Sequence, residues 1–434
     1  MSQVWRNWSG TETAQGVEIL QPGSVDELAS AVKTAAEQGK KLKAVGAGHS
    51  FTGCAAPEQV MVRLDGLSSI TSADKDSGRV TVGAGTGLRK LNAGLAAFDL
   101  AMANLGDIDK QTIAGAISTG THGTGAKLGG IATQIAALDL VTADGSVLHC
   151  SPEENADVFN AARVSVGALG VISSITLQTV PAYLLRAQEM PLPLADVLDG
   201  FDELADGNDH FEFYWFPHTD VALTKRNNRV AEGVPASPVG AVRGWIDDEL
   251  LSNRVFELTN RLAMRRPALV PRINRLATRA LSAREYVDAS YKVFVSERNV
   301  LFRESEYAVP REHVVEVLRR LRDWIDASGH HLPFPIEVRV AAADDIWLST
   351  ASGRDTAYIA IHQYHRLPHD IYFQAFERIV AEYQGRPHWG KMHTLGAEDF
   401  RALYPHYDDF LAVRDRVDPQ RAFSNPYTRT IFGS

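Results

Sequence analysis

Two glycine-rich loops in the first half of the chain constrain its fold more than any other feature. The first, Val45-Gly46-Ala47-Gly48-His49-Ser50, follows a predicted strand at Lys41–Val45, and the second runs from Gly115 to Gly125. Backbone N–H groups can crowd around a phosphate only where side chains do not intrude, so both loops favour phosphate binding. The alternative for either loop alone is a tight turn or a close strand contact.

Two familiar phosphate-binding motifs are incomplete in these loops. The dinucleotide fingerprint GxGxxG, started at Gly46, would need a third glycine where Phe51 stands. The second loop has the glycine spacing of a P-loop at Gly120 and Gly125, but it continues as Ala126-Lys127-Leu128, without the required Lys-Ser/Thr. The sequence therefore argues against a nicotinamide-binding Rossmann fold and against a P-loop nucleotidase.

Composition excludes several other classes of protein. A net charge of −9 over 434 residues, with no basic run, argues against a nucleic-acid partner. Two cysteines, Cys54 and Cys150, exclude a disulfide framework. The chain shows neither an apolar signal region near the N-terminus nor an apolar stretch of 18 residues. These features predict a cytoplasmic protein, and a membrane-associated location is the alternative.

The pattern of apolar residues and turns predicts two α+β halves that meet near residue 183. In the first half, Ser24 and Glu27 form a capping box before a helix that ends at Gly39. The further elements expected there are strands at Arg79–Val82, Leu138–Thr142, Val147–His149 and Val171–Val180, with helices at Leu88–Phe98 and Ala161–Leu169. The second half is expected to hold strands at Phe211–Phe216, Tyr291–Val295, Phe302–Val309, Pro335–Ala341 and Tyr358–Tyr364, with helices in 233–285 and at Glu312–Ala327 and Ile371–Tyr383.

Three well-separated motifs identify a family. They are the first loop through Phe51, the run Thr121-His122-Gly123-Thr124-Gly125, and His388-Trp389-Gly390-Lys391. Over its whole length the chain resembles the aldonolactone oxidoreductases of the vanillyl-alcohol-oxidase flavoprotein superfamily. The resemblance implies an FAD-binding domain of the PCMH type with two α+β subdomains in 1–182. It also implies an α+β cap with a mainly antiparallel sheet in 183–400, and a segment 401–434 that packs back on the FAD domain.

The same resemblance implies which residues hold the FAD. In the family the first loop binds the pyrophosphate, and its histidine, here His49, can bond to the flavin 8α-methyl carbon. Some relatives carry another residue at that position and bind FAD non-covalently, so a hydrogen-bonding loop histidine is the alternative. The predicted FAD-binding residues are Val45, Gly46, Ala47, Gly48, His49, Ser50, Gly106, Asp107, Thr112, Gly115, Ala116, Ser118, Thr119, His122, Gly123, Val171 and His388.

Strand alternation places the predicted substrate-binding residues on one surface. In the strand Pro335–Ala341, Glu337 and Arg339 share a face opposite the apolar residues. An exposed salt bridge is the alternative, but by resemblance these two residues match the substrate-site Glu and Arg of the family. His362 lies on one face of the strand Tyr358–Tyr364, which makes it a candidate for the same pocket or a satisfied core histidine.

Lys391 is a fixed positive charge in the last motif, and in the family this lysine lies near flavin and substrate. With Glu337, Arg339 and His362 it completes the predicted catalytic set. The histidines show no convincing zinc spacing, so no metal is expected.

The reaction implied by the resemblance is oxidation at carbon 2 of a sugar 1,4-lactone of the L-gulono or D-arabinono type. Hydride passes to flavin N5, and the product is of the ascorbate type. Arg339 and Lys391 would stabilise developing negative charge, while the base could be His362, Glu337 or a neutral Lys391. The electron acceptor is oxygen, which Gly106 favours, or a cytochrome or quinone-like acceptor, which would bring peripheral membrane contact.

Two competing functions remain at the level of sequence. An alditol oxidase would use the same groups on a linear polyol such as xylitol, although Asp107 stands where those enzymes carry serine. A non-catalytic flavin-binding protein would have a disused cap pocket, against which the retained Glu337, Arg339 and Lys391 argue.

Overall fold

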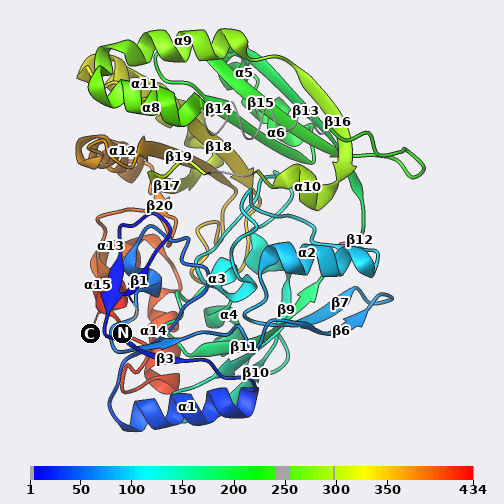
Figure 1. Ribbon diagram of the computed structural model, residues 1–434, viewed down its shortest axis with the longest axis vertical. Coiled ribbons are helices and arrows are strands. Elements are labelled where there is room, and N and C mark those ends of the chain that lie inside the picture. Colours follow the sequence, from blue (N-terminus) through cyan, green and yellow to red (C-terminus); the bar gives the residue numbers. More distant parts are fainter. Residues whose placement is uncertain (1–3, 241–254, 297–298, 434) are drawn as a thin grey trace.

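The computed structural model describes residues 4–240, 255–296 and 299–433. The chain forms a lower body, which contains both glycine loops, and an upper body built around one large sheet (Figure 1). The change from one to the other falls between β12 (Val180–Pro181) and β13 (Leu184–Pro193), which belong to different sheets. This point coincides with the boundary predicted after residue 182.

The first part of the lower body is a small parallel sheet covered by one helix. In the sheet, β5 (Val60–Val62) pairs in parallel with both β3 (Glu18–Leu20) and β4 (Leu42–Ala44). Helix α1 (Val25–Glu37) starts as predicted, because the Ser24 side chain accepts a hydrogen bond from the Glu27 amide. Its buried residues Leu28, Val32 and Ala35 anchor it to the core.

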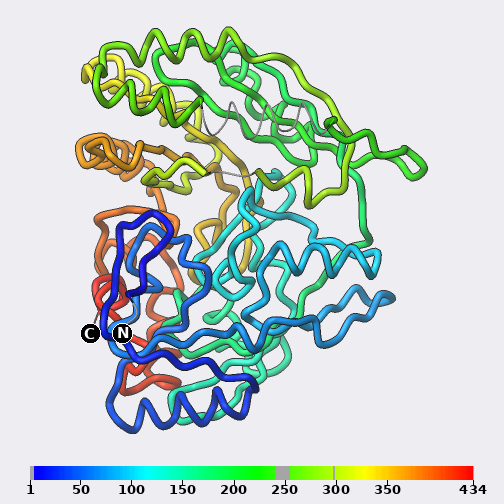
Figure 2. The backbone as a smooth tube through the Cα atoms, in the orientation of Figure 1, coloured from blue at the N-terminus to red at the C-terminus, as the bar shows by residue number. Residues whose placement is uncertain are grey.

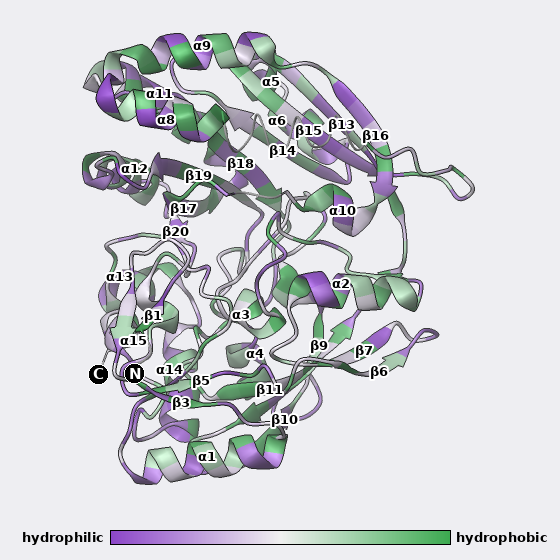
Figure 3. Ribbon diagram, viewed as in Figure 1, coloured by the Kyte–Doolittle hydropathy of each residue, from purple (hydrophilic) through white to green (hydrophobic). Residues whose placement is uncertain are grey.

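The second part of the lower body is an antiparallel five-stranded sheet with the order β10-β9-β11-β7-β6. These strands and the short elements around them are β6 (Ile70–Asp74), β7 (Arg79–Gly83), α2 (Leu88–Ala97), β8 (Leu100–Ala101), α3 (Ile113–Ser118), β9 (Ile135–Val141), β10 (Val147–Cys150), α4 (Ala156–Ala162) and β11 (Val171–Gln178). Strands β9 and β11 are strongly hydrophobic (Figure 3), because both of their faces are covered. The N-terminal pair β1 (Val4–Arg6) and β2 (Thr13–Gln15) lies outside this sheet.

The upper body is built on an eight-stranded antiparallel sheet with the order β16-β13-β15-β14-β18-β19-β17-β20. Its strands after β13 are β14 (His210–Trp215), β15 (Val221–Arg229), β16 (Arg284–Ala289), β17 (Phe302–Pro310), β18 (Ile336–Ala341), β19 (Thr356–Tyr364) and β20 (Arg386–Pro387). Its helices are α5 (Leu194–Asp199), α6 (Phe201–Asp206), α8 (Phe256–Arg265), α9 (Val270–Ala280), α10 (Ser290–Phe294), α11 (Val314–Ser328) and α12 (Asp370–Ala381). The apolar faces of α11 and α12 cover one side of the sheet and bury the apolar alternation of β18.

The C-terminal segment returns to the lower body. Helices α13 (Ala397–Leu403), α14 (Tyr407–Val417) and α15 (Pro426–Phe432) contribute aromatic residues to the same core as α1 and β11. Figure 2 shows this segment beside the start of the chain, and the Asn425 amide donates to the carbonyl oxygens of Gly53 and Ala56. The boundary predicted at 400/401 is wrong in detail, because it cuts through α13 and Phe400 already packs in the lower core.

Two predicted elements differ from the structure. Tyr291–Val295 was expected as a strand from its alternating apolar residues, but most of it forms the short helix α10, since five residues do not separate the two periods. The helix expected at Ala161–Leu169 ends at Ala162, because Val166 and Gly167 adopt positive φ angles of 52° and 61°. Part of the helical region expected at 233–285 lies outside the described residues. No described helix is long and apolar enough to cross a membrane.

Candidate active site

The first glycine loop and helix α3 face each other across a cavity of about 280 Å³ in the lower body. The loop contributes all six residues from Val45 to Ser50 to the lining. The opposite wall contains Thr112, Gly115, Ser118 and Thr119, four of the residues predicted to bind FAD. Lys43 and Arg63 bring positive charge to the same lining, and Asp65 is its carboxylate. This wall of glycine backbone and cationic side chains suits an anionic pyrophosphate.

Glycine is required where these two walls approach each other. A Cβ atom added at Gly46 would lie 2.4 Å from Thr112 Oγ1, and Gly48 adopts a φ of +70°. Gly123 in the second loop would meet Asn104 Oδ1 at 2.3 Å and the Leu105 carbonyl at 2.4 Å. The two glycine motifs therefore act differently, because the first lines the cavity while Gly123 permits close packing behind it.

A second cavity of about 70 Å³ lies between the lower body and the sheet of the upper body. His49 and Ser50 line both cavities, so His49 stands where the two spaces meet. Its ring stacks on Trp8 at 5.7 Å between centroids. Burial, together with the charges of Lys110 and Lys391, lowers the pKa of His49 to about 4. The imidazole is therefore neutral near pH 7 and keeps a nitrogen lone pair.

The other predicted FAD-binding residues divide into lining and packing positions. Gly106, Asp107, His122 and His388 line the second cavity. Ala116 and Val171 do not line the cavity, because their side chains are fully buried in the lower core, and their contact with FAD stays a prediction. The cavity lining contains their neighbours instead, which are Ala114 and Gly115 beside α3, and Gly170 and Ile172 at β11.

Glu337 and Arg339 lie side by side in the second cavity, as strand alternation predicts. The Arg339 guanidinium forms an ion pair with Glu337, and its Nε donates to Glu212 Oε2 at 2.8 Å. Asp107 Oδ2 lies 3.7 Å from Arg339 Nη2. Burial alone would lower the pKa of Arg339, but the surrounding carboxylates, first Glu337 and then Glu212, hold it well above its usual range. A surface salt bridge is excluded, because both side chains are at least nine-tenths buried.

Lys391 approaches the same cavity from the C-terminal motif. Its Nζ lies 2.5 Å from Glu304 Oε2 and 4.0 Å from Glu306 Oε2. Burial lowers the pKa of Lys391, but the two carboxylates outweigh that effect and raise it above its ordinary value. Lys391 is therefore a permanent cation and not a neutral amine, which removes it from the set of possible bases.

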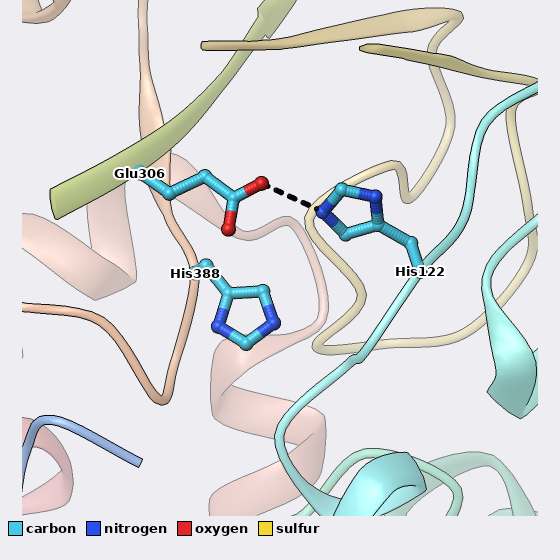
Figure 4. A group of neighbouring side chains, drawn as sticks. All are labelled: His122, Glu306 and His388. Atoms are coloured by element: carbon cyan, nitrogen blue, oxygen red, sulfur yellow. Dashed lines mark hydrogen bonds and ion pairs between the residues drawn. The ribbon is translucent and has the colours of Figure 1, made fainter. Parts of the chain in front are cut away.

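His122, Glu306 and His388 form a buried cluster at one wall of the second cavity (Figure 4). His122 Nε2 lies 2.9 Å from Glu306 Oε1, and its Nδ1 lies 2.9 Å from the Gly123 carbonyl. Burial opposes ionisation of Glu306, but His122 dominates and lowers the pKa of Glu306 to about 2. Both ring nitrogens of His122 therefore face oxygen atoms, which fixes the orientation of the ring at this wall of the cavity.

The donor set of this cluster suits a divalent ion poorly. His388 Nδ1 accepts the Gly390 amide hydrogen at 3.1 Å, which places the ring proton on Nε2 and leaves no lone pair for a metal. Burial lowers the pKa of His388 to about 3, so the ring is neutral. Among the described residues this is the one group with metal-like spacing. The absence of a metal stays a prediction.

His362 does not line the cavity. Its Nδ1 faces the Pro335 carbonyl at 3.1 Å, and its ring packs against Phe302. In the sheet, Ala360 is the residue opposite Glu337, and Ala360 lines the cavity instead. His362 lies opposite Glu304, with 3.6 Å between its Nε2 and Glu304 Oε1. His362 therefore shares the strand face of Ala360 but lies two residues farther along β19. The alternation of side chains predicts the face of a strand but not its register with the neighbouring strand.

Sequence reasoning missed the three carboxylates that hold the cations of the site. Glu304 and Glu306 lie on β17, and Glu212 lies on β14. The sequence does contain an indication of their role, because each of these glutamates lies within a strand that was predicted from its apolar and aromatic residues. Acidic residues buried in such strands need a cation opposite them.

The comparisons with known proteins agree with this geometry. Residues 18–151 match the family model described as FAD binding domain, and residues 175–431 match the model described as D-arabinono-1,4-lactone oxidase. The chain belongs to the D-arabinono-1,4-lactone oxidase family. It is a flavoprotein oxidoreductase, and its FAD domain is the lower body that contains the two glycine loops.

Individual relatives cover the whole chain. L-gulono-1,4-lactone dehydrogenase of Mycobacterium tuberculosis is 45% identical over 100% of both chains. L-gulonolactone oxidase of Mus musculus is 36% identical over 99% of this chain and 98% of the relative. The crystal structure of cholesterol oxidase from B. sterolicum, at 18% identity, superposes with a TM-score of 0.84 over 100% of this chain and 97% of the other. That last similarity shows the fold alone.

Proposed function

We propose that this protein oxidises carbon 2 of a sugar 1,4-lactone, of the L-gulono or D-arabinono type, to an ascorbate-type product. The observation that carries the proposal is the cavity that His49 shares with the cofactor space and that Glu337, Arg339 and Lys391 line. The names of the relatives, which are gulonolactone and arabinonolactone oxidoreductases, support the same substrate class.

The residues present fit FAD, since a glycine-backbone cavity with two cations adjoins a neutral histidine. When bound, FAD supplies a two-electron acceptor for hydride at N5. Arg339 and Lys391 are held protonated by buried carboxylates, so both can attract a lactone carbonyl and the hydroxyl oxygen that gains negative charge as its proton leaves. Their carboxylate partners keep them in place before the substrate arrives, which removes a reorganisation cost.

We assign acceptance of the hydroxyl proton to Glu337. Of the three groups considered as base, Lys391 is held protonated and His362 lies outside the cavity lining. Glu337 lines the cavity, and Tyr214 Oη donates to its Oε1 at 3.1 Å, which orients the carboxylate. The ion pair with Arg339 keeps the acid and the cation on the same side of the substrate.

Oxygen or a cytochrome or quinone-like molecule is the proposed electron acceptor, and the cytoplasm is the proposed location. Gly106 lines the cavity and has no side chain there, which supports access for oxygen. The name of the Mycobacterium tuberculosis relative, a dehydrogenase, supports an acceptor other than oxygen.

An alditol oxidase is the second candidate function. It is favoured by a 29% identity to the alditol oxidase of a Streptomyces species over 99% of both chains. The Asp107 carboxylate in the cavity lining, near Arg339, favours the lactone.

Anaerobic reduction of the bound flavin by a panel of substrates tests the proposal. Bleaching by L-gulono-1,4-lactone or D-arabinono-1,4-lactone at a rate well above that with xylitol or sorbitol is the expected result. Faster bleaching by the polyols would establish the alditol oxidase instead, and no bleaching by any compound would indicate a flavin-binding protein without this activity.

A further inference from the structure

Helices α8 and α9 repeat one pattern of leucine and arginine on their exposed surfaces. In α8 the residues Leu258, Arg261, Leu262 and Arg265 follow the spacing i, i+3, i+4, i+7. In α9 the same spacing holds Arg272, Arg275, Leu276 and Arg279. Residues at this spacing share one helix face, so each helix presents a stripe in which leucine is flanked by arginine.

The leucines of this pattern are among the most exposed apolar residues in the described part of the chain. Leu258 is 68% exposed, Leu262 is 43% exposed and Leu276 is 70% exposed. Isolated exposed leucines are ordinary, but three on two consecutive helices are not.

The same helices place polar side chains inward. Asn274 is buried, and its amide donates to the carbonyl oxygens of Pro217 and Leu332. Asn260 is fully buried and donates to the Phe256 carbonyl. The inner faces also bury Ala263 and Val270, whereas the three leucines of the outer faces stay exposed in the described part of the chain.

Charge on this segment is opposite to that of the whole protein. Residues 255–280 contain six arginines and one acidic residue, Glu257, whereas the whole chain has a net charge of −9. All six arginines, at 261, 265, 266, 272, 275 and 279, are exposed. Glu257 forms an ion pair with Arg261. The excess of positive charge is complementary to an anionic surface.

We propose that α8 and α9 bind the surface of an anionic membrane. The leucines would enter the boundary between headgroups and acyl chains, and the arginines would extend along the surface to the lipid phosphates. The position in the fold permits this contact, because α9 lies at the end of the upper body that is farthest from α1 and α8 precedes it along the chain (Figure 1). Figure 3 shows the alternating hydrophobic and hydrophilic bands along both helices.

The contact is expected to be weak and reversible. The attraction between each arginine and an anionic leaflet is lost over a distance of about 8 Å at physiological salt. Without the leucines the attraction would vanish in high salt, and without the arginines neutral and anionic lipid would bind equally. Binding therefore requires both the leucines and the arginines, and variants that change only one of the two sets can test each contribution separately.

Sedimentation of the FAD-loaded enzyme with vesicles tests the proposal. Vesicles of phosphatidylcholine alone are compared with vesicles that contain phosphatidylglycerol, at low and high salt. The variants are Leu258→Gln with Leu262→Gln, and Arg272→Gln with Arg275→Gln and Arg279→Gln. The matched controls are Phe98→Gln, an exposed apolar residue directly after α2, and Arg6→Gln with Arg79→Gln and Arg378→Gln, three exposed arginines elsewhere.

We expect the wild type to bind the anionic vesicles and not the vesicles of phosphatidylcholine alone. Either helix variant should reduce this binding at least tenfold, and the control variants should leave it unchanged. The lactone-dependent reduction of a soluble dye should stay at the wild-type rate in every variant, so this test is independent of the proposed substrate. Absent binding by the wild type, or equal losses in controls and helix variants, would overturn the proposal. A helix variant that changes the oligomeric state in light scattering, without any vesicle binding, would assign the stripe to contacts between copies of the chain.

Discussion

Lys391 Nζ and Glu304 Oε2, which are 87 positions apart in the chain, lie 2.5 Å from each other beside the cavity of the active site. The pair joins the C-terminal motif to β17, and the Met392 amide donates to the Glu304 carbonyl. Burial opposes ionisation of Glu304, but Lys391 and His362 lower the pKa of its carboxyl strongly. Glu304 is therefore the nearer of the two buried carboxylates that keep Lys391 charged.

Glu304→Gln should make the activity sensitive to alkaline pH. In the wild type the raised pKa of Lys391 keeps the ammonium protonated well above neutrality. In the variant the negative charge of Glu304 no longer counteracts the effect of burial, so the pKa of Lys391 falls. The ammonium then loses its proton as the pH rises through this lower pKa. A tenfold additional loss of kcat/KM is expected for each pH unit above that value, from about 1.4 kcal/mol per pKa unit.

The pH profile of kcat/KM measures this effect. Glu316→Gln, which changes an exposed glutamate on α11, is the matched control and should keep the wild-type profile. If kcat/KM falls at the same alkaline pH in Glu304→Gln and in the wild type, Glu304 does not set the pKa of Lys391.

Removal of either member of the Glu337–Arg339 pair should lower kcat/KM by about 10²-fold or more, the scale of one lost transition-state contact. Arg339→Lys should also be poor, because an ammonium cannot span Glu337 and Glu212 as the planar guanidinium does. Arg339→Ala should in addition lower the free energy of unfolding by about 3 kcal/mol, since buried carboxylates lose their cation. Arg284→Ala, which breaks the Glu189 pair on the same sheet but outside the cavity, should keep normal kinetics.

His49 should carry FAD covalently. Its neutral ring stands at the junction of the two cavities with a lone pair free for a bond to the flavin. Acid-precipitated wild-type protein should therefore stay yellow, and His49→Ala should release its colour into the supernatant. His149→Ala removes an exposed histidine on β10 and should behave as wild type. Complete release of flavin by the wild type would reject the covalent bond.

Gly106→Ala should slow reoxidation of the enzyme by oxygen and leave reduction by substrate nearly intact. The added Cβ would lie 3.1 Å from the His122 carbonyl oxygen and 3.3 Å from Thr121 Cγ2, so it fits after a small shift and narrows the cavity. Stopped-flow measurement of the two half-reactions separates the effects. Gly396→Ala is the control, because its new Cβ would lie 3.9 Å from the Thr430 carbonyl oxygen and 4.0 Å from Asp399 Oδ2, which is ordinary van der Waals contact. An unchanged oxygen rate would mean that residue 106 does not control access.

Features that depend on neighbours in the chain were predictable. The Ser24 cap and the buried face of α1 follow from spacings of three and four residues, and both are present. The shared face of Glu337 and Arg339 follows from the two-residue period of a strand and is also present. The first glycine loop and the start of the second likewise line the cavity that their composition indicates.

Features that depend on strand register were not predictable. His362 lies on the expected strand but opposite Glu304, and Ala360 takes the place beside Glu337. The contact between His122 and Glu306 joins the second loop to the eight-stranded sheet, 184 positions away in the chain. Local patterns contain no information about which strands become neighbours or at which register they pair.

The two glycine loops, the strand faces and the motif histidine and lysine could be recognised in the amino-acid sequence, because each depends on backbone geometry within a few residues. The charge states of the site depend instead on the folded arrangement of distant strands. Arg339 and Lys391 remain cations, because folding brings Glu212, Glu304 and Glu306 from distant strands into a buried space. In that space water no longer screens the charges, so each carboxylate and its cation stabilise each other's ionised form.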